Sequence, residues 1–280
     1  MIRKLYPYGK KKTFNVTYDD GVLQDIRFVE LLNKYQLKGT FNLNSAMSES
    51  GFEWIHESGL VVKRLKTEIL KSLYASHEVA SHTLNHPYMD SLTKEEILHE
   101  LSADKANLER LFGAEIKGFA VPFYYYSELI ETCVKECGFE YARISEESCS
   151  FTPQNDYYNW KATVFHCCEE LEDLTQRFLE TDEELAIFQI VGHSYDLDVE
   201  NMWDLMEGIF AAISTQSDIL PMTTVEIIDY LKAMEKAEIT GRYIQNNSNL
   251  SLWFAVNNAV CEVKPSESIA ISCAADVHFS

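Results

Sequence analysis

The chain has 280 residues, of which 46% are hydrophobic and 24% charged, so it can bury one large core together with a small appendage. Its 44 acidic residues outnumber 24 basic ones, and the formal net charge of −20 repels nucleic-acid phosphates. No segment approaches the ~20 apolar residues of a membrane span, and the N-terminus lacks the apolar core of a signal peptide. We therefore expect no nucleic-acid or membrane partner and a cytoplasmic location.

Short β-rich runs alternate with amphipathic helical patterns along most of the chain, which is typical of a parallel sheet or barrel with helices outside. One helix is predicted from Thr93 to Phe112, with a capping box at its start, and another from Thr223 to about Lys236. The first strand is expected to begin near Lys12. The predicted strands are Thr13–Tyr18, Gly39–Asn44, Glu78–Ser81, Gly118–Val121, Tyr141–Ile144, Ala162–His166, Leu185–Val191 and Ile219–Met222.

The pattern changes after Ala237, where short alternating runs replace the β/α rhythm. We predict a small β appendage over residues 238–280 and a main domain over residues 1–237. The β-like runs lie around two turn-rich segments, Asn246–Asn249 and Asn257–Asn258, and comprise Arg242–Gln245, Leu250–Val256, Val260–Val263 and Ile269–Cys273.

Two adjacent carboxylates, Asp19 and Asp20, follow the first predicted strand of the main domain, in the segment Thr17–Gly21. In parallel β/α folds the carboxyl ends of strands carry the reactive groups. Two ionised neighbours repel each other unless a cation or hydrogen-bond donors neutralise one. A divalent metal would let one Asp coordinate while the other takes a proton from water. Taken alone, the segment is better explained as a turn with solvated side chains.

Two histidines, His82 and His86, follow the predicted strand Glu78–Ser81. Histidines four residues apart lie on one face of a helical turn and can bind one ion, and Pro87 would limit that turn. With one Asp they form the ligand set of a catalytic metal that keeps open positions. Zinc is the first choice, and nickel, cobalt or manganese would fit the same ligands.

Two further histidines follow apolar strands, and either could protonate a leaving group. His193 ends the run before Ser194 and could serve as a general acid on the side opposite Asp19. His166 lies at a similar strand end, but the evidence for a catalytic role is weaker than for His193. A histidine satisfied by nearby backbone is the alternative for both.

In order and rhythm, Lys12 to Lys236 resembles the polysaccharide deacetylase family, the carbohydrate esterases of family 4 with a NodB-homology domain. The resemblance implies an α/β fold, an irregular (β/α) barrel, with Asp19 as general base and His193 as general acid. It implies Asp20, His82 and His86 as ligands of one divalent metal ion. The substrate would be an acetylated carbohydrate.

One motif departs from the family pattern. The third motif usually reads Arg-x-Pro-Tyr, but here the matching segment is Ala120 to Tyr124, containing Pro122 and Phe123, so the arginine is absent. Arg143 on the next predicted strand is the candidate replacement as the charge partner of the base. The aromatic run Phe123–Tyr126, which includes Tyr124, either walls a sugar subsite or packs beside the strand end.

Three functions remain open from the sequence. The leading one is a metal-dependent hydrolase that removes acetyl groups, N- or O-linked, from a carbohydrate. The second is a carbohydrate-binding protein with lost or weak catalysis, which the missing motif arginine favours. The third is a metal-dependent amidase acting on a small non-sugar amide. The sequence leaves the sugar and a homo-oligomeric state undecided.

Overall fold

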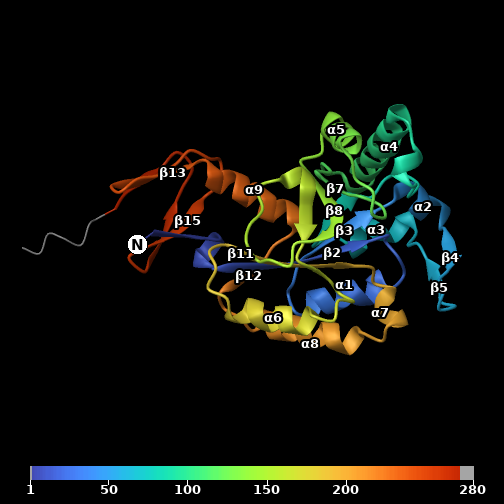
Figure 1. Cartoon of the computed structure of the whole chain (residues 1–280), viewed down its shortest axis with the longest axis horizontal. Helices are drawn as coiled ribbons and strands as arrows, with labels where there is room; N and C mark the ends of the chain where they lie inside the picture. Colours follow the sequence, from blue (N-terminus) through green and yellow to red (C-terminus); the bar gives the residue numbers. More distant parts are fainter. Residues whose placement is uncertain (1, 272–280) are drawn as a thin grey trace, which may run out of the picture.

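The computed structural model describes residues 2–271 and is organised around one large parallel sheet (Figure 1). Its strands run in the order β10-β11-β2-β3-β6-β7-β8-β9, and β12 pairs with the start of β2. Every pairing in this sheet is parallel. The strands are β2 Lys12–Asp19, β3 Gly39–Leu43, β6 Glu78–Ser81, β7 Gly118–Ala120, β8 Tyr141–Glu147, β9 Trp160–Ala162, β10 Val164–Phe165, β11 Ala186–Gly192 and β12 Ile219–Pro221.

The two ends of this sheet order are consecutive in the chain. Only Thr163 separates β9, which pairs with β8, from β10, which pairs with β11. The Thr163 amide donates to the carbonyl of Gln189 on β11 at 2.9 Å. The sheet therefore curls until its ends meet in one continuous segment, and the α/β fold with a parallel sheet agrees with the sequence prediction.

Helices cover the sheet, with α1, α6, α7 and α8 along its lower side in Figure 1 and α2 to α5 around its other end. Within residues 2–271, no helix combines the length and apolar character that a bilayer span requires. The helices are α1 Asp25–Lys34, α2 Ser45–Ser50, α3 Thr67–Leu73, α4 Lys94–Phe112, α5 Glu128–Glu136, α6 Leu171–Glu180, α7 Asp196–Val199, α8 Trp203–Ser214 and α9 Thr224–Glu235, with 3-10 turns η1 Pro7–Gly9, η2 Met89–Ser91 and η3 Tyr157–Asn159.

The two predicted helices are confirmed, with their caps. Thr93 and Thr223 each accept a hydrogen bond from a glutamate amide three residues on, and that glutamate bonds back to the cap. The helix α4 ends at Gly113, whose φ of +70° a residue without Cβ adopts at little cost. Each of the eight predicted strands of the main domain corresponds to an observed strand or to the pair β9–β10.

The β-rich C-terminal region forms two small antiparallel sheets at the end of the molecule where α9 finishes (Figure 1). The Asn257–Asn258 turn joins β15 to β16 with positive φ at both residues, as a tight hairpin turn requires. Cys273, the predicted end of the last strand, lies outside the described residues. The sheets are β1-β15-β16 and β13-β14-β17, with β1 Ile2–Leu5, β13 Ala237–Ile239, β14 Tyr243–Asn246, β15 Leu252–Val256, β16 Ala259–Val263 and β17 Ser268–Ala270.

The expectation that the first strand begins near Lys12 is wrong. Ile2–Leu5 forms β1, which pairs antiparallel with β15, so the N-terminus completes the C-terminal sheet. A four-residue run with two charged side chains carries no strong periodicity, and its partner lies about 250 residues further along the chain. The division into residues 1–237 and 238–280 stays a prediction. The N-terminal strand β1 falls within the first of these ranges but pairs with β15 of the second.

Two hydrophobic clusters fill the interior. The larger lies between the parallel sheet and helices α1, α4, α5, α6 and α8. The smaller joins α9 to the C-terminal sheets through Tyr6, Tyr230 and Phe254. The appendage therefore packs on the main domain through a shared core, leaving the opposite end of the sheet for the side chains described next.

Candidate active site

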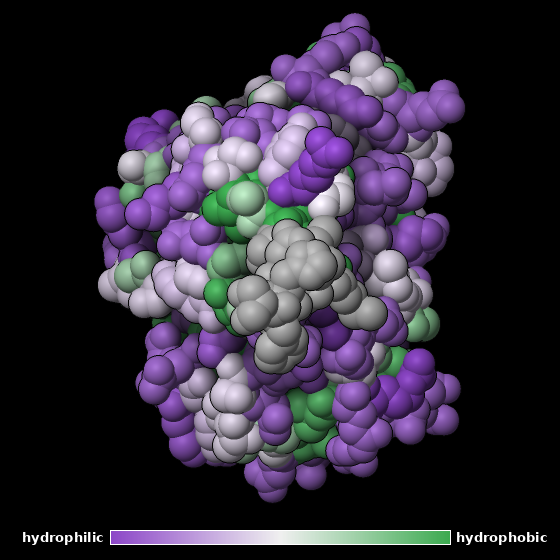
Figure 2. Space-filling model, turned by 90° about the vertical axis from the view of Figure 1, so that its left-hand side faces the viewer, coloured by the Kyte–Doolittle hydropathy of each residue, from purple (hydrophilic) through white to green (hydrophobic). Residues whose placement is uncertain are grey.

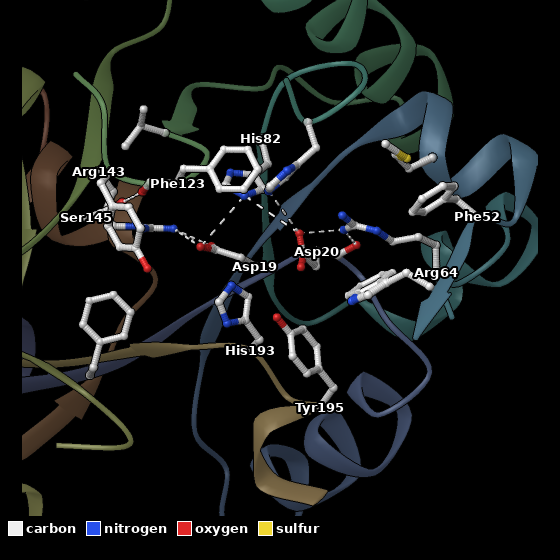
Figure 3. A pocket seen from close by; sticks show the side chains of 16 residues that line it. Asp19, Asp20, Phe52, Arg64, His82, Phe123, Arg143, Ser145, His193 and Tyr195 are labelled. Carbon is white, nitrogen blue, oxygen red and sulfur yellow. Dashed lines mark hydrogen bonds and ion pairs between the residues drawn. The ribbon is translucent and has the colours of Figure 1, made fainter. Parts of the chain in front are cut away.

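The sequence-predicted residues gather at the carboxyl edge of the parallel sheet, around a cavity of about 470 Å³. Asp19 ends β2, His82 follows β6 and His193 follows β11, so parallel pairing brings all three strand ends to one rim. Figure 3 shows Asp19 in the middle, with His82 above it, His193 below and Asp20 beside it. The volume lies in the usual range for small-molecule sites.

Asp19 is a buried carboxylate with a fixed set of donors. Arg143 donates from one terminal nitrogen to both of its oxygens, and Asn42 donates to Oδ1 at 2.7 Å. Burial alone would raise the pKa of Asp19, but Arg143, His82 and His193 together outweigh it and hold the pKa below its usual range. Asp19 is therefore ionised near neutral pH.

Asp20 occupies a left-handed backbone conformation, with φ of +85°, which turns its side chain toward the histidines. Arg64 donates to the Asp20 carbonyl, and its guanidinium lies 2.8 Å from Oδ1. Burial would raise the pKa of Asp20, and the Arg64 charge lowers it well below the usual range. Among the described residues, Oδ1 accepts no hydrogen bond, so a lone pair remains on a buried acceptor.

His82 is oriented by a backbone carbonyl. Its Nδ1 lies 2.8 Å from the Ala120 oxygen, which makes Nδ1 the protonated nitrogen and leaves the lone pair on Nε2. That Nε2 lies 3.9 Å from Asp20 Oδ1. Burial is the main reason that the pKa of His82 falls to about 3, so the ring is neutral at pH 7, the form that binds metals.

His86 reaches the site by a route that the sequence analysis did not predict. The segment after Ser81 is not helical: Thr83 and His86 both have positive φ, at +69° and +54°. Pro87 disfavours the helical conformation at the residue before it, and the Thr83 hydroxyl accepts from the His86 amide at 3.1 Å. The prediction of a helical turn is therefore wrong, although the rings still lie 4.9 Å apart.

Asp20, His82 and His86 together fit a divalent metal ion. One ligand atom from each residue lies within 4.8 Å of the others, and His86 Nε2 is 3.6 Å from Asp20 Oδ1. Two neutral imidazoles and one carboxylate leave further coordination positions for water or substrate. Asp20 Oδ1 is the clearest sign of fit, because it forms an ion pair with Arg64 but accepts no hydrogen bond from the described residues, so a lone pair remains for an ion.

His193 belongs to a chain of polar contacts that extends behind the cavity. Its Nδ1 lies 3.0 Å from Asp196 Oδ2, and His166 Nε2 lies 3.5 Å from the same oxygen. The Tyr18 hydroxyl lies 2.7 Å from His166 Nδ1. Burial would lower the pKa of His193, but the bond to Asp196 and the charges of the neighbouring aspartates raise it to about 9. His166 is buried and does not line the cavity.

Arg143 stands beside the position of the missing motif arginine. Ala120 and Arg143 are partners in the register between β7 and β8, so the guanidinium comes from the neighbouring strand. Pro122 is buried and does not line the cavity, whereas Phe123 and Tyr124 do. Phe123 stacks on Tyr88 with 3.8 Å between ring centroids.

The opposite wall of the cavity went unpredicted. It comes from the hairpin of β4 Glu53–Ile55 and β5 Val61–Lys63, which carries Trp54 and precedes Arg64. Arg64 lies over the Trp54 ring at 5.2 Å, and Tyr195 meets the same ring edge-on at 5.6 Å. These residues are not part of any motif that can be recognised in the sequence, so only the folded structure shows that they line the cavity.

Comparison with known proteins finds a matching family model. Residues 7–142 match the family model described as polysaccharide deacetylase. An uncharacterized protein of Bacillus subtilis, YlxY, is 27% identical over 108 residues, which cover 39% of this chain and 29% of that protein. The alignment therefore spans less than a third of the relative's length.

Solved structures share the fold at low sequence identity. A structure titled a putative polysaccharide deacetylase from Mycobacterium smegmatis has a TM-score of 0.60 at 13% identity, covering 83% of this chain and 94% of the other. A family 4 carbohydrate esterase (CE4) pseudoenzyme from Bacillus anthracis has a TM-score of 0.51 at 16% identity, covering 81% and 68%. The fold thus occurs in a protein described as a pseudoenzyme, so it does not by itself establish catalysis.

The α/β fold and the site at its carboxyl edge define a NodB-type domain. The match to the polysaccharide deacetylase family model spans residues 7–142, slightly less than half of the chain, and supports a polysaccharide deacetylase domain there. Deacetylation of a carbohydrate is the chemistry that this family model names. The matched segment includes Asp19, Asp20, His82 and His86 and ends before His166 and His193.

Proposed function

We propose that this protein is a metal-dependent hydrolase that removes acetyl groups from an acetylated carbohydrate. One observation carries the proposal: Asp19, Asp20, His82, His86 and His193 converge on one cavity, with the three ligand atoms of Asp20 and the histidines within 4.8 Å. A bound divalent ion, with zinc as first choice, would supply the Lewis acidity that polarises the acetyl carbonyl and acidifies water.

The chain's own residues account for the proton transfers. Asp19, kept ionised by Arg143, accepts the proton of the attacking water as that water adds to the acetyl carbon. His193, with its pKa raised to about 9, is protonated at neutral pH and donates from Nε2 to the departing nitrogen or oxygen. Asp196 holds its Nδ1 and so leaves Nε2 as the donating atom.

The test is acetate release from a panel of N- and O-acetylated oligosaccharides. Protein stripped with a chelator is reloaded with zinc, cobalt, nickel or manganese, beside Asp20→Ala and Asp19→Asn variants. Release that depends on the metal and on both aspartates supports the proposal. A protein that binds one equivalent of metal yet releases no acetate with any of the four ions would refute it.

Two other functions are distinguished in the same experiment. For a binding protein with lost catalysis, Asp19→Asn keeps the affinity for the oligosaccharides and no variant changes turnover. That reading gains from the fold's occurrence in a pseudoenzyme, whereas the intact pairing of Asp19 with Arg143 favours catalysis. For an amidase acting on a small non-sugar amide, acetylated amines without a sugar ring would be the better substrates.

A further inference from the structure

A second cavity, of about 520 Å³, lies at the opposite end of the sheet, between the main domain and the C-terminal strands. Its floor includes Leu220 and Pro221 of β12, which pair with the start of β2, whereas Asp19 lies at the end of β2. Five residues of strand separate Phe14 from Asp19, or roughly 17 Å. This groove is therefore distinct from the candidate active site.

An aromatic pair walls the groove. The rings of Tyr8 and Trp253 lie 5.8 Å apart, and 74% of Tyr8 is exposed. Tyr8 has a φ of +64°, an uncommon backbone conformation for a residue with a bulky side chain. The next residue, Gly9, also has positive φ, and a Cβ there would lie 2.8 Å from Val260, so the turn is pressed onto β16. The turn thus holds a strained aromatic residue outward.

Trp253 is held in place from behind. Its amide donates to the Tyr230 hydroxyl at 3.1 Å, and that hydroxyl donates to the Leu5 carbonyl at 2.6 Å. Neither the Trp253 indole nitrogen nor the Tyr8 hydroxyl oxygen forms a hydrogen bond within residues 2–271, and neither of these two atoms is buried. The pair therefore offers two flat apolar faces and two unused polar groups to solvent.

A single uncompensated carboxylate stands beside the pair. Glu262 is the cross-strand neighbour of Trp253 in the β15–β16 ladder and is exposed. It forms no ion pair or hydrogen bond within the described part of the chain. The other acids at the groove are matched: Glu226 pairs with Lys38 at 2.5 Å and Asp229 pairs with Lys117 at 3.3 Å.

We propose that this groove, walled by Tyr8, Trp253 and Glu262, binds an amino-sugar chain that carries free ammonium groups. Aromatic faces attract both the apolar face of a sugar ring and a nearby cation. Glu262 provides the counter-charge, and the net charge of −20 favours a cationic polymer. The ligand class rests on the proposed function in its amide form, because hydrolysis of an N-acetyl group yields an amine, which is protonated at mildly acidic pH. The groove would hold the enzyme on a partly deacetylated chain.

A second copy of the chain fits this surface less well. Figure 2 looks onto the end of the molecule that carries the C-terminal strands, and the coloured part of that face is mostly hydrophilic, with hydrophobic residues in small separate patches. Stable homodimers bury larger and more continuous apolar areas. A soluble cationic glycan needs only the small aromatic platform and its carboxylate.

The test measures binding of a glucosamine hexamer and of an N-acetylglucosamine hexamer to the full chain by calorimetry. We expect the glucosamine hexamer to bind more tightly, and Trp253→Ala and Tyr8→Ala to weaken it at least tenfold. Glu262→Gln should abolish the preference for the amine while leaving the acetylated hexamer unchanged. Trp54→Ala, which removes an aromatic side chain from the catalytic cavity, is the matched control and should leave glucosamine binding intact.

Several outcomes would overturn the proposal. Wild-type affinity in both Tyr8→Ala and Trp253→Ala refutes it, and so does loss of binding in Trp54→Ala alone. A wild-type dimer that becomes a monomer in Trp253→Ala, by sedimentation velocity, makes the groove a subunit interface. Because Tyr8 is largely exposed, its variant tests the site even if Trp253→Ala unfolds. Absence of acetate release with intact groove binding would refute the proposed function and leave this site standing.

Discussion

The charge on His193 offers the sharpest test of the proposed acid. Its pKa of about 9, against an ordinary value of 6.5, corresponds to roughly 3 kcal/mol in favour of the protonated ring. The carboxylate of Asp196, 3.0 Å from Nδ1, shares this effect with Asp19 and Asp20. Asp196→Asn removes the nearest negative charge and keeps a side chain of similar shape. We expect the pKa of His193 to fall by roughly one to two pH units.

The consequence appears in the alkaline limb of the pH–rate profile. With its pKa near 9, His193 is mostly protonated at pH 8.5, whereas after the fall it is mostly neutral. The kcat/KM of Asp196→Asn should therefore drop about tenfold at pH 8.5 and stay within about twofold of wild type at pH 6. Acetate release measured from pH 5 to 10 gives both values.

Stability follows the same titration. A group whose folded pKa is raised stabilises the fold fully below its unfolded pKa, and this contribution disappears as the pH rises through the folded value. The stability deficit of Asp196→Asn should thus be largest below pH 6.5 and vanish above about 9, as followed by urea unfolding.

Asp198→Asn is the matched control. Asp198 lies in the same short helix and accepts hydrogen bonds from Gln24 and Trp203, away from His193. It should leave the alkaline limb unmoved. An alkaline limb that stays at wild-type pH in Asp196→Asn, with activity retained, would refute the assignment of His193 as the acid or of Asp196 as its charge partner.

Three further predictions concern the groups around the two aspartates. Arg143→Met leaves Asp19 buried without its cation, so the free energy of unfolding should fall by about 3–5 kcal/mol. Acetate release should fall at least a hundredfold at pH 6 and recover in part at higher pH, because Asp19 would then titrate at a higher pKa. Unchanged activity would eliminate Arg143 as the partner of Asp19. Arg64→Met removes a positive charge 2.8 Å from Oδ1 of Asp20. Zinc affinity, measured by chelator competition, should rise roughly tenfold or more, because the repulsion between the guanidinium and a bound cation is worth several kcal/mol at an effective dielectric constant of ~20. Weaker zinc binding would mean that Arg64 mainly orients Asp20. Gly192→Ala puts a methyl group 2.2 Å from the buried ring of His166 and should destabilise the fold by about 1–3 kcal/mol. Thermal unfolding measures this change, and an unchanged midpoint would show that the ring can move aside.

The parallel core could be predicted from the sequence because its signals are local. Apolar β-rich runs, capping boxes at Thr93 and Thr223 and the glycine after α4 each depend on residues within a few positions. The two aspartates and the histidines followed such strands, so the rule that parallel strands end at one edge brought them together. The site residues that were predicted are those that neighbour a recognisable strand end.

The rest depended on contacts between distant segments. β1 could not be predicted because its register with β15 is set by a partner at the other end of the chain. Arg64 and Trp54 lie on a hairpin whose sequence carries no catalytic signature, and they reach the cavity only because that hairpin folds over the rim. The loop at His86 was given helical geometry because spacing alone cannot distinguish a helical turn from two left-handed residues.

The missing motif arginine illustrates how the fold can conserve a contact while the sequence position moves. Ala120 occupies the position where the family motif has arginine, and its partner in the next strand, Arg143, donates to both oxygens of Asp19. Adjacent strands lie ~4.8 Å apart, so a long side chain one strand away can reach the same carboxylate. The small side chain at position 120 leaves that path open, and its carbonyl orients His82. In the proposed mechanism the base needs a guanidinium at its oxygens, and Arg143 supplies one, so the departure in the motif is compatible with catalysis.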